Sequence, residues 1–303
     1  MKDITENGMT DNQLTEIFDT HAHYDDKAFD EDREELLKIL PESGIARVVN
    51  VGSSLGACKR TIELMSKYDY IYGALGVHPS DCAELDEESF AWLKLQLSLD
   101  KCVAVGEIGL DYYWDDVERE IQQKWFVRQL NLARECKKPV IIHSREAAKD
   151  TVDIMNAEKA GEIGGVIHCY SYTKETARDF LNMDYYFGIG GVLTFNNAKK
   201  LKEAVEYIPL DKIVLETDCP YLAPVPNRGK RNSSLNLPYV VTALAEMKGI
   251  VPFVILRLSR LFLRVRSRSF LSQMVFLLTT ASASMTRSVA LISVGAALAL
   301  GSS

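Results

Sequence analysis

Residues 139–143 read Pro-Val-Ile-Ile-His, and residues 212–218 read Lys-Ile-Val-Leu-Glu-Thr-Asp. In both stretches apolar residues follow one another without alternation, which is typical of a parallel strand buried on both faces. Each stretch ends in a polar side chain, His143 or Asp218. Because the carboxyl ends of parallel strands lie at one edge of a sheet, these side chains are expected to lie in the same region.

The same rhythm of apolar run and amphipathic stretch repeats from residue 17 to residue 250. It predicts eight strands, over residues 17–21, 47–52, 70–77, 102–107, 139–143, 165–168, 185–193 and 212–218. Helices are expected over residues 30–40, 55–68, 88–99, 121–137, 147–157, 174–183, 199–207 and 237–248. Eight such units in about 235 residues predict an α/β fold, a TIM-type (β/α)8 barrel. A doubly wound sheet is the alternative, although no Gly-x-Gly-x-x-Gly follows the first strand.

The composition limits the class of protein. The chain has 303 residues, 47% of them hydrophobic and 25% charged, which excludes collagen-like, disordered and disulfide-scaffold proteins. With 42 acidic and 35 basic residues, the net charge is −7, so nucleic-acid binding would need a local clamp or bound cations. The six cysteines form no Cys-x-x-Cys pair and the N-terminus carries no apolar signal segment, so we expect a cytoplasmic protein.

The charge pattern divides the chain into three parts. Residues 1–16 form a polar extension, and residues 17–250 form the expected barrel. Residues 251–303 form an atypical tail, because from Met247 onward there are seven basic residues and no Asp or Glu. This composition fits a shifted reading frame or a fused coding stretch. The uncharged stretches of the tail are shorter than the roughly 20 residues of a membrane span, so membrane contact is a minor alternative.

The histidines mark a site. Each falls at the carboxyl end of a predicted strand, where the active sites of barrels are built; they are His21, His23, His78, His143 and His168. One such histidine is usually structural, but five at the same edge are hard to explain by packing.

Spacing and carboxylates point to a metal. In His21-Ala-His23 the two imidazoles project to the same side of a strand, close enough to share one ion. Glu107 and Asp218 also end strands, where a buried carboxylate is costly unless it is paired or bound to a cation. A salt bridge to Arg or Lys is the alternative for each. Mixed imidazole and carboxylate ligands suit Zn²⁺, Mn²⁺, Co²⁺ or related ions without deciding among them.

Six motifs in order resemble the TatD family of metal-dependent deoxyribonucleases over about residues 17–249. They are Phe18-Asp-Thr-His-Ala-His, Gly76-Val-His-Pro, Val105-Gly-Glu-Ile-Gly-Leu-Asp-Tyr, Pro139-Val-Ile-Ile-His-Ser-Arg, His168-Cys-Tyr-Ser and Glu216-Thr-Asp-Cys-Pro-Tyr-Leu-Ala-Pro. The resemblance implies an amidohydrolase-type TIM barrel that hydrolyses DNA phosphodiesters, with members described as exonucleases. It further implies activation of water by two divalent ions, Mg²⁺, Mn²⁺, Zn²⁺ or Co²⁺.

The resemblance also implies roles for the ligands. Glu107 bridges the two ions, and Asp218 binds metal and orients or deprotonates the attacking water. The remaining ligands are His21 and His23 at one ion and His143 and His168 at the other.

DNA is the expected substrate, and no stable protein partner is implied. His78 is assigned to phosphate contact or to support of the ligands. Tyr112, with Tyr113 and Trp114, is a candidate for stacking on an unpaired base, although local packing is the alternative. The candidate phosphate-binding residues, whose alternative is a solvated loop charge, are Arg145, Arg228, Lys230 and Arg231.

The chain departs from the family pattern in two places. Arg231-Asn-Ser-Ser stands where the family usually has Arg-Asn-Glu-Pro, and nothing after Ile250 resembles the family's final helices. The first departure predicts that an acidic contact at that loop is missing. The second predicts that the barrel's outer cover is incomplete, which would expose apolar surface and lower stability. Two other functions stay open: a metal-dependent amidohydrolase or aminoacyl-tRNA deacylase, and a poorly folded product without activity.

Overall fold

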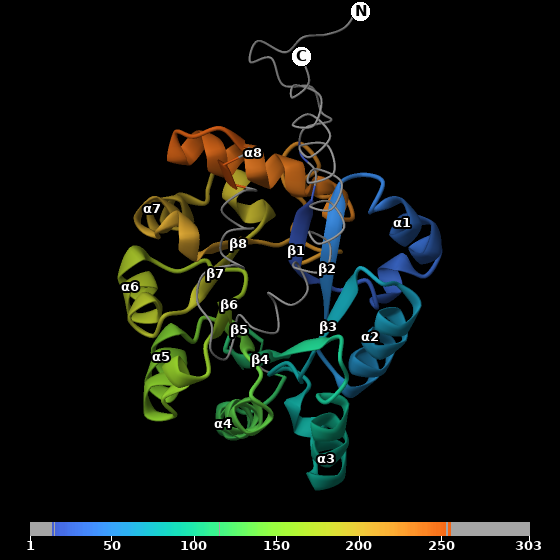
Figure 1. The fold of residues 1–303 in the computed structure, drawn as a ribbon. Coiled ribbons are helices and arrows are strands. Elements are labelled where there is room, and N and C mark those ends of the chain that lie inside the picture. Colours follow the sequence, from blue (N-terminus) through green and yellow to red (C-terminus); the bar gives the residue numbers. More distant parts are fainter. Residues whose placement is uncertain (1–13, 15, 115, 253, 256–303) are drawn as a thin grey trace, which may run out of the picture.

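The computed structural model describes residues 14, 16–114, 116–252, 254 and 255. Its core is one sheet of eight parallel strands in sequential order (Figure 1). The strands are β1 (Ile17–Ala22), β2 (Ile45–Gly52), β3 (Ile71–Leu75), β4 (Cys102–Asp111), β5 (Val140–Arg145), β6 (Gly165–Ile167), β7 (Tyr186–Ile189) and β8 (Ile213–Leu215). The helices between and after them are α1 (Arg33–Ile39), α2 (Leu55–Lys67), α3 (Glu87–Gln96), α4 (Arg119–Cys136), α5 (Ala148–Ala157), α6 (Lys174–Asn182), α7 (Lys199–Tyr207) and α8 (Leu237–Lys248).

The first and last strands meet, so the sheet closes on itself. Ala22 forms a parallel bridge with Cys219, and the hydroxyl of Thr20 donates to the carbonyl of Leu215 at 2.9 Å. The amide of His23 also donates to the carbonyl of Cys219 at 2.8 Å. Sequential strand order with this closure confirms the predicted TIM-type barrel and excludes the doubly wound alternative.

Strand bounds differ from the prediction where pairing continues or stops. β4 and β5 run past their predicted ends to Asp111 and Arg145, because those two residues still pair across the strands. β7 ends at Ile189 instead of residue 193, since the chain enters a 3-10 turn, η5 (Gly191–Thr194). The extensions of β4 and β5 carry polar side chains beyond the apolar run that marked these strands in the sequence.

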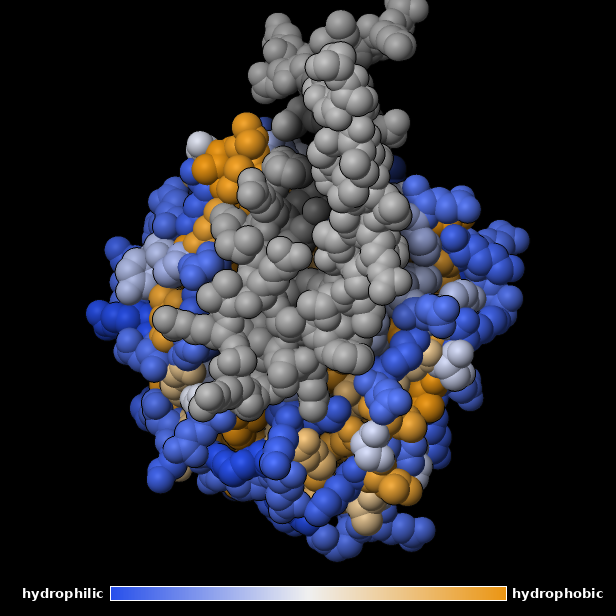
Figure 2. Space-filling view, viewed as in Figure 1, coloured by the Kyte–Doolittle hydropathy of each residue, from blue (hydrophilic) through white to orange (hydrophobic). Residues whose placement is uncertain are grey.

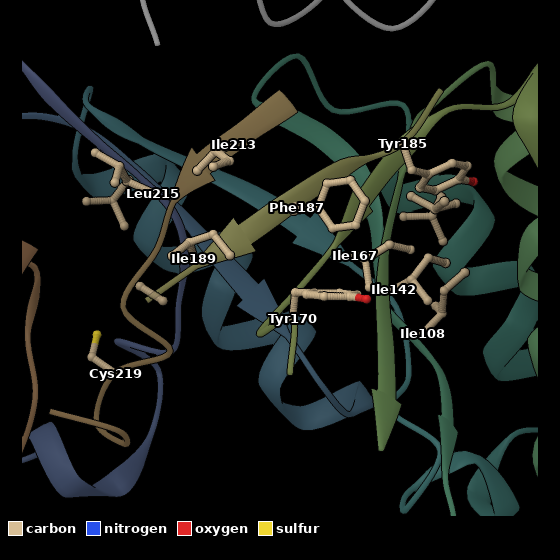
Figure 3. Packing of buried hydrophobic residues seen from close by; sticks show 14 of the residues in the cluster. Ile108, Ile142, Ile167, Tyr170, Tyr185, Phe187, Ile189, Ile213, Leu215 and Cys219 are labelled. Atoms are coloured by element: carbon tan, nitrogen blue, oxygen red, sulfur yellow. The ribbon is translucent and has the colours of Figure 1, made fainter. Parts of the chain in front are cut away.

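A layer of apolar side chains fills the space between the sheet and its helices. Figure 3 shows part of this core, in which Ile142, Ile167 and Phe187 come from the neighbouring strands β5, β6 and β7. The ring of Tyr170 packs edge-on against Phe187, with centroids 5.0 Å apart. One face of each strand packs against the helices, and the other faces the side chains that fill the barrel. Both faces are therefore buried, as the unbroken apolar runs of the sequence indicate.

The terminal predictions fall largely outside the described residues. Of the extension 1–16 and the tail 251–303, the structure describes only residues 14, 16, 251, 252, 254 and 255, so the incomplete cover stays a prediction. Figure 2 shows hydrophobic residues gathered at the surface over α8. Within the described part of the chain, no helix is both long enough and apolar enough to span a membrane.

Candidate metal centre

The six predicted ligands lie together at the carboxyl ends of the strands. His21 lies near the end of β1, with His23 just after it, and Glu107 lies within β4. His143 belongs to β5, while His168 and Asp218 follow β6 and β8. Several groups of three among the described residues have ligand atoms within 4.8 Å of one another, including His21 with His23 and Glu107, and Glu107 with His143 and His168.

The carboxylate of Glu107 stands between two pairs of imidazoles. Its Oε1 lies 2.8 Å from Nδ1 of His143 and 3.1 Å from Nε2 of His168. Its Oε2 lies 3.5 Å from Nε2 of His21 and 3.7 Å from Nε2 of His23. One oxygen thus faces each pair, which is the geometry that lets a carboxylate be shared by two neighbouring ions.

Asp218 completes the side of the centre formed by β1. The Nε2 atoms of His21 and His23 are only 3.0 Å apart, and Oδ1 of Asp218 lies 3.3 Å from the second of them. Asp218 has φ 56°, in the left-handed region that Asp tolerates better than most residues. Burial alone would lower the pKa of His23, but Asp218, with smaller contributions from Glu107 and Asp25, outweighs it and raises that pKa to about 9.

Hydrogen bonds fix which ring nitrogens carry a proton. Nδ1 of His23 lies 2.8 Å from the carbonyl of Val51, so it donates and leaves the Nε2 lone pair of the neutral ring facing the centre. His78 has the opposite arrangement, because the amide of Ser80 donates to its Nδ1 at 3.1 Å. Nε2 of neutral His78 therefore carries the hydrogen and is a donor, unsuited to binding a metal.

Two further carboxylates support the ligands. Asp111 Oδ2 lies 2.9 Å from Nε2 of His143, and Glu216 Oε1 lies 3.6 Å from Nδ1 of His168. Sequence reasoning missed both, although signals existed. Asp111 is four residues after Glu107 on the same strand, hence on the same face. Glu216 directly follows β8 and lies two residues before Asp218.

Within the centre, buried carboxylates and imidazoles stabilise one another's charged forms. Burial opposes the charged form of Glu107, but the facing imidazoles of His168 and His143 outweigh it and hold the pKa of its carboxyl well below the usual value. Burial likewise opposes the charged form of His168, yet Glu107 and Glu216 raise the pKa of its ring. Removing one partner would leave the other charged and buried, which is strongly destabilising in proteins.

The centre opens into a cavity of about 860 Å³. Its lining residues include His23, Glu107, His143, His168 and Asp218. A cavity of this size is within the range of small-molecule and cofactor sites.

Comparison with known proteins identifies the family. The family model for TatD related DNase matches residues 18–259, most of the chain and somewhat past Ile250. This chain belongs to the TatD family. It is 43% identical over 232 residues to YabD, an uncharacterized metal-dependent hydrolase of Bacillus subtilis, covering 77% of this chain and 91% of YabD.

Other TatD relatives agree. The crystal structure of YJJV, a TatD homologue from Escherichia coli, superposes with a TM-score of 0.76 at 29% identity, covering 81% of this chain and 95% of YJJV. A Cronobacter sakazakii relative named 3′-5′ ssDNA/RNA exonuclease TatD is 30% identical over 242 residues, 78% of this chain and 92% of the relative. The chain is therefore a metal-dependent hydrolase of the TatD family.

The predicted substrate contacts divide into two groups. His78 and Arg145 line the cavity, and so does Trp114. Tyr112 instead donates its hydroxyl to Asp150 at 2.8 Å and is not among the described lining residues.

The basic residues after β8 also have other neighbours. Arg231 pairs with Asp32, its Nη1 lying 2.7 Å from Oδ1, and the guanidinium of Arg228 lies 4.3 Å from the ring centre of Phe195. Lys230 belongs to a turn in which its amide donates to the carbonyl of Asn227. None of the three is among the described lining residues, so their contact with substrate stays a prediction.

The departure from the TatD pattern at Ser234 has a structural consequence. The hydroxyl of Ser234 donates to Oδ2 of Asp19 at 2.6 Å, a bond that a proline there could not make. Thr217 donates to the same oxygen at 2.7 Å, which ties β1 to the segment carrying Asp218. Burial raises the pKa of the Asp19 carboxyl to about 7, although the hydrogen bonds from Ser234 and Thr217 oppose that rise.

Proposed function

We propose that this TatD-family hydrolase is a deoxyribonuclease that cleaves DNA phosphodiester bonds with two divalent cations, from a strand end. The observation that carries the proposal is the position of Glu107 between the histidine pairs His21/His23 and His143/His168. The name of the Cronobacter relative, an exonuclease on single-stranded DNA and RNA, supports the choice of substrate and of exonuclease mode.

The donor atoms fit divalent cations. His21 and His23 are buried with their Nε2 atoms 3.0 Å apart, and the hydrogen bond from His23 to Val51 turns a lone pair toward that point. A cation there would replace the hydrogen shared by these two nitrogens and accept a lone pair from each. Imidazole nitrogen with carboxylate oxygen favours Zn²⁺, Mn²⁺ or Co²⁺ over Mg²⁺, which prefers oxygen ligands.

The charge of the cavity also calls for cations. With its histidines neutral, the form in which they bind metal, the cavity is lined by six carboxylates and three basic side chains, and this negative lining would repel a polyanion. Two divalent cations carry four charges, more than the deficit of three. The carboxylates are Asp25, Asp26, Asp30, Asp81, Glu107 and Asp218, and the basic residues are Lys27, Arg60 and Arg145.

The chain's own residues supply the remaining chemistry. Bound divalent cations would polarise a phosphoryl oxygen and acidify a water. Asp218, whose side chain is 18% exposed against 5% for Glu107, is the carboxylate that can reach that water and accept its proton. The Nε2 hydrogen of His78 donates to a phosphate oxygen, and Arg145 binds phosphate at the rim.

An assay with end-labelled DNA tests this function. Protein stripped with chelator is incubated with single-stranded oligonucleotides labelled at the 5′ or the 3′ end, with and without Mn²⁺, Zn²⁺ or Mg²⁺. Activity should require metal, and Asp218→Asn should lower kcat at least about a hundredfold, in the range of general-base loss. Asp211→Asn, a change at an exposed carboxylate before β8, is the matched control.

Other outcomes identify other functions. Activity that survives chelation, or that Asp218→Asn leaves intact, contradicts the proposal. An aminoacyl-tRNA ester and a small amide are assayed in parallel, and hydrolysis of either without DNA cleavage would make the chain an amidohydrolase or deacylase. An RNA oligonucleotide of the same sequence measures the preference for DNA, and the two labels give the polarity.

We also propose a cytoplasmic location. All six cysteines are free thiols, and four of them are buried. Unpaired thiols in this number fit a reducing compartment.

A further inference from the structure

One wall of the cavity carries a guanidinium that no part of the metal chemistry uses. Arg60, on α2, lines the cavity with its side chain 52% exposed. Its Nε donates to the backbone carbonyl of Asp25 at 3.1 Å, and its Nη2 lies 3.5 Å from Oδ2 of the same residue. These contacts engage one edge of the guanidinium, and its five N–H groups leave further donors for a ligand in the cavity.

The anchor of Arg60 is itself rigid. Asp25 is buried, and its Oδ1 accepts from the side-chain amide of Asn50 at 2.9 Å. The same amide nitrogen lies 2.8 Å from the hydroxyl of Thr61 on α2, while Oδ1 of Asn50 accepts from the amide of Tyr24 at 2.6 Å. The loop after β1 and the first turns of α2 are thereby joined, so Arg60 is held in place before any ligand arrives.

The anchor also fixes Arg60 close to the metal centre. Asp25 follows His23 by two residues, a separation of at most about 7 Å along an extended chain. Arg145 approaches the cavity from the end of β5, where its guanidinium lies 3.8 Å from the ring centre of Tyr113. Two cationic side chains therefore line the cavity from different parts of the barrel, Arg60 from α2 and Arg145 from the end of β5.

Two other carboxylates of the cavity lining, those of Asp26 and Asp30, already have partners. Oδ1 of Asp26 accepts from the amide of Ala28 at 2.7 Å, and Oδ1 of Asp30 pairs with Nη2 of Arg33 at 2.6 Å. Lys27, between them in sequence, also lines the cavity and adds a second positive charge to its lining.

We propose that Arg60, with Lys27, forms a second phosphate-binding subsite that holds the phosphate next to the scissile one. The inference rests on the proposed phosphodiesterase function and narrows its substrate to a chain with at least two adjacent phosphates. A lone diester would contact the metal centre but would offer no second phosphate to the remaining donors of Arg60. An oligonucleotide would place one phosphate at the metal centre and the next at Arg60.

The test compares substrates with and without a neighbouring phosphate. The full chain, loaded with Mn²⁺, is assayed on a thymidine oligonucleotide and on bis(p-nitrophenyl) phosphate. Arg60→Ala should lower the ratio of the two kcat/KM values at least about tenfold, the usual size of one lost charged hydrogen bond, with Arg60→Lys in between. Lys59→Ala is the matched control, because Lys59 is the neighbour of Arg60 on α2 but lies 5.7 Å from the ring centre of Trp92.

A binding measurement separates this subsite from the proposed function. A fluorescein-labelled phosphorothioate oligonucleotide, which keeps the charges and resists cleavage, is titrated at several salt concentrations. Losing one phosphate contact should reduce the slope of log Kd against log salt by about 0.7. Equal losses on both substrates in Arg60→Ala, or an unchanged salt slope, would overturn the subsite. If the wild-type chain cleaves neither substrate, the proposed function fails, and the salt slope alone supports or rejects the subsite.

Discussion

Asp111 Oδ2 lies 2.9 Å from Nε2 of His143, and the other oxygen of the same carboxylate accepts the amide of Tyr113 at 2.9 Å. One side chain thereby orients a predicted metal ligand and begins the turn that carries Trp114 to the cavity. Carboxylates that hold the second nitrogen of a ligating histidine set its orientation and basicity.

Asp111→Asn should lower metal affinity and kcat by about 10- to 100-fold, because the amide can no longer hold the ring as an anion does. Metal affinity is measured by titrating Mn²⁺ or Zn²⁺ into stripped protein. Asp116→Asn, at an exposed position in the same loop, is the control. If the two variants bind metal equally well, Asp111 has no role in positioning His143.

The barrel and the ligand cluster could both be predicted from the sequence for one reason. Buried parallel strands have unbroken apolar runs, and their carboxyl ends must meet, so His143 and Asp218 were predictable neighbours although 75 residues separate them. The rim was less predictable, because it depends on contacts between loops. Arg231 pairs with Asp32, which is 199 residues away in sequence, and no local pattern indicates that pair.

The aromatic residues after β4 illustrate the same limit. Tyr112, Tyr113 and Trp114 are consecutive aromatic residues, and the sequence alone does not indicate which of them reaches the cavity. That choice depends on the turn in which Asp111 accepts the amides of Tyr113 and Trp114. Tyr112 turns toward Asp150, whereas Trp114 lines the cavity. A turn fixed by a side chain from within the strand is a tertiary feature that composition does not reveal.

Arg145 and Arg231 should differ when each is replaced by Ala. Arg145 lines the cavity, so its loss should reduce kcat/KM on oligonucleotides about tenfold or more. Arg231 is already paired with Asp32 and bonded to the carbonyl of Ala28, so its loss should mainly affect stability, by about 1 kcal/mol or less for so exposed a pair. Steady-state kinetics and thermal unfolding of both variants check this. If Arg231→Ala lowered kcat/KM as much as Arg145→Ala does, Arg231 would also contact the substrate.

Removing metal should lower the thermal stability reversibly. Cations that bind the folded state alone stabilise it by about 2.7 kcal/mol at a concentration 100 times Kd, which corresponds to roughly 5–10 °C in a domain of this size. Melting curves of stripped and reloaded protein measure the shift. Glu107→Gln should lose the response to metal, whereas Glu87→Gln, at an exposed position on α3, should keep it. Identical melting curves with and without metal would contradict a centre built on Glu107.

Because Gly188 on β7 has no side chain, the carboxylate of Glu216 can pack directly against it. A Cβ at residue 188 would lie 1.9 Å from Oε2 of Glu216, so Gly188→Ala must displace that carboxylate. Glu216 is buried and accepts the amide of Cys169 at 2.6 Å, next to His168. We expect Gly188→Ala to cost about 1–3 kcal/mol of stability by overpacking and also to weaken metal binding, because His168 loses its support.

A matched glycine and a compensating change separate the two effects. At Gly56, on α2, a new Cβ would find its nearest neighbour at 3.5 Å, so Gly56→Ala should retain stability or gain up to about 1 kcal/mol from helix propensity. Adding Glu216→Asp to Gly188→Ala shortens the displaced side chain and should recover stability, but a shorter carboxylate stands farther from His168 and should not restore metal affinity. Calorimetric unfolding and metal titration of the single and double variants measure both quantities. Wild-type metal affinity in destabilised Gly188→Ala would mean that Glu216 supports the fold of this strand end without positioning His168.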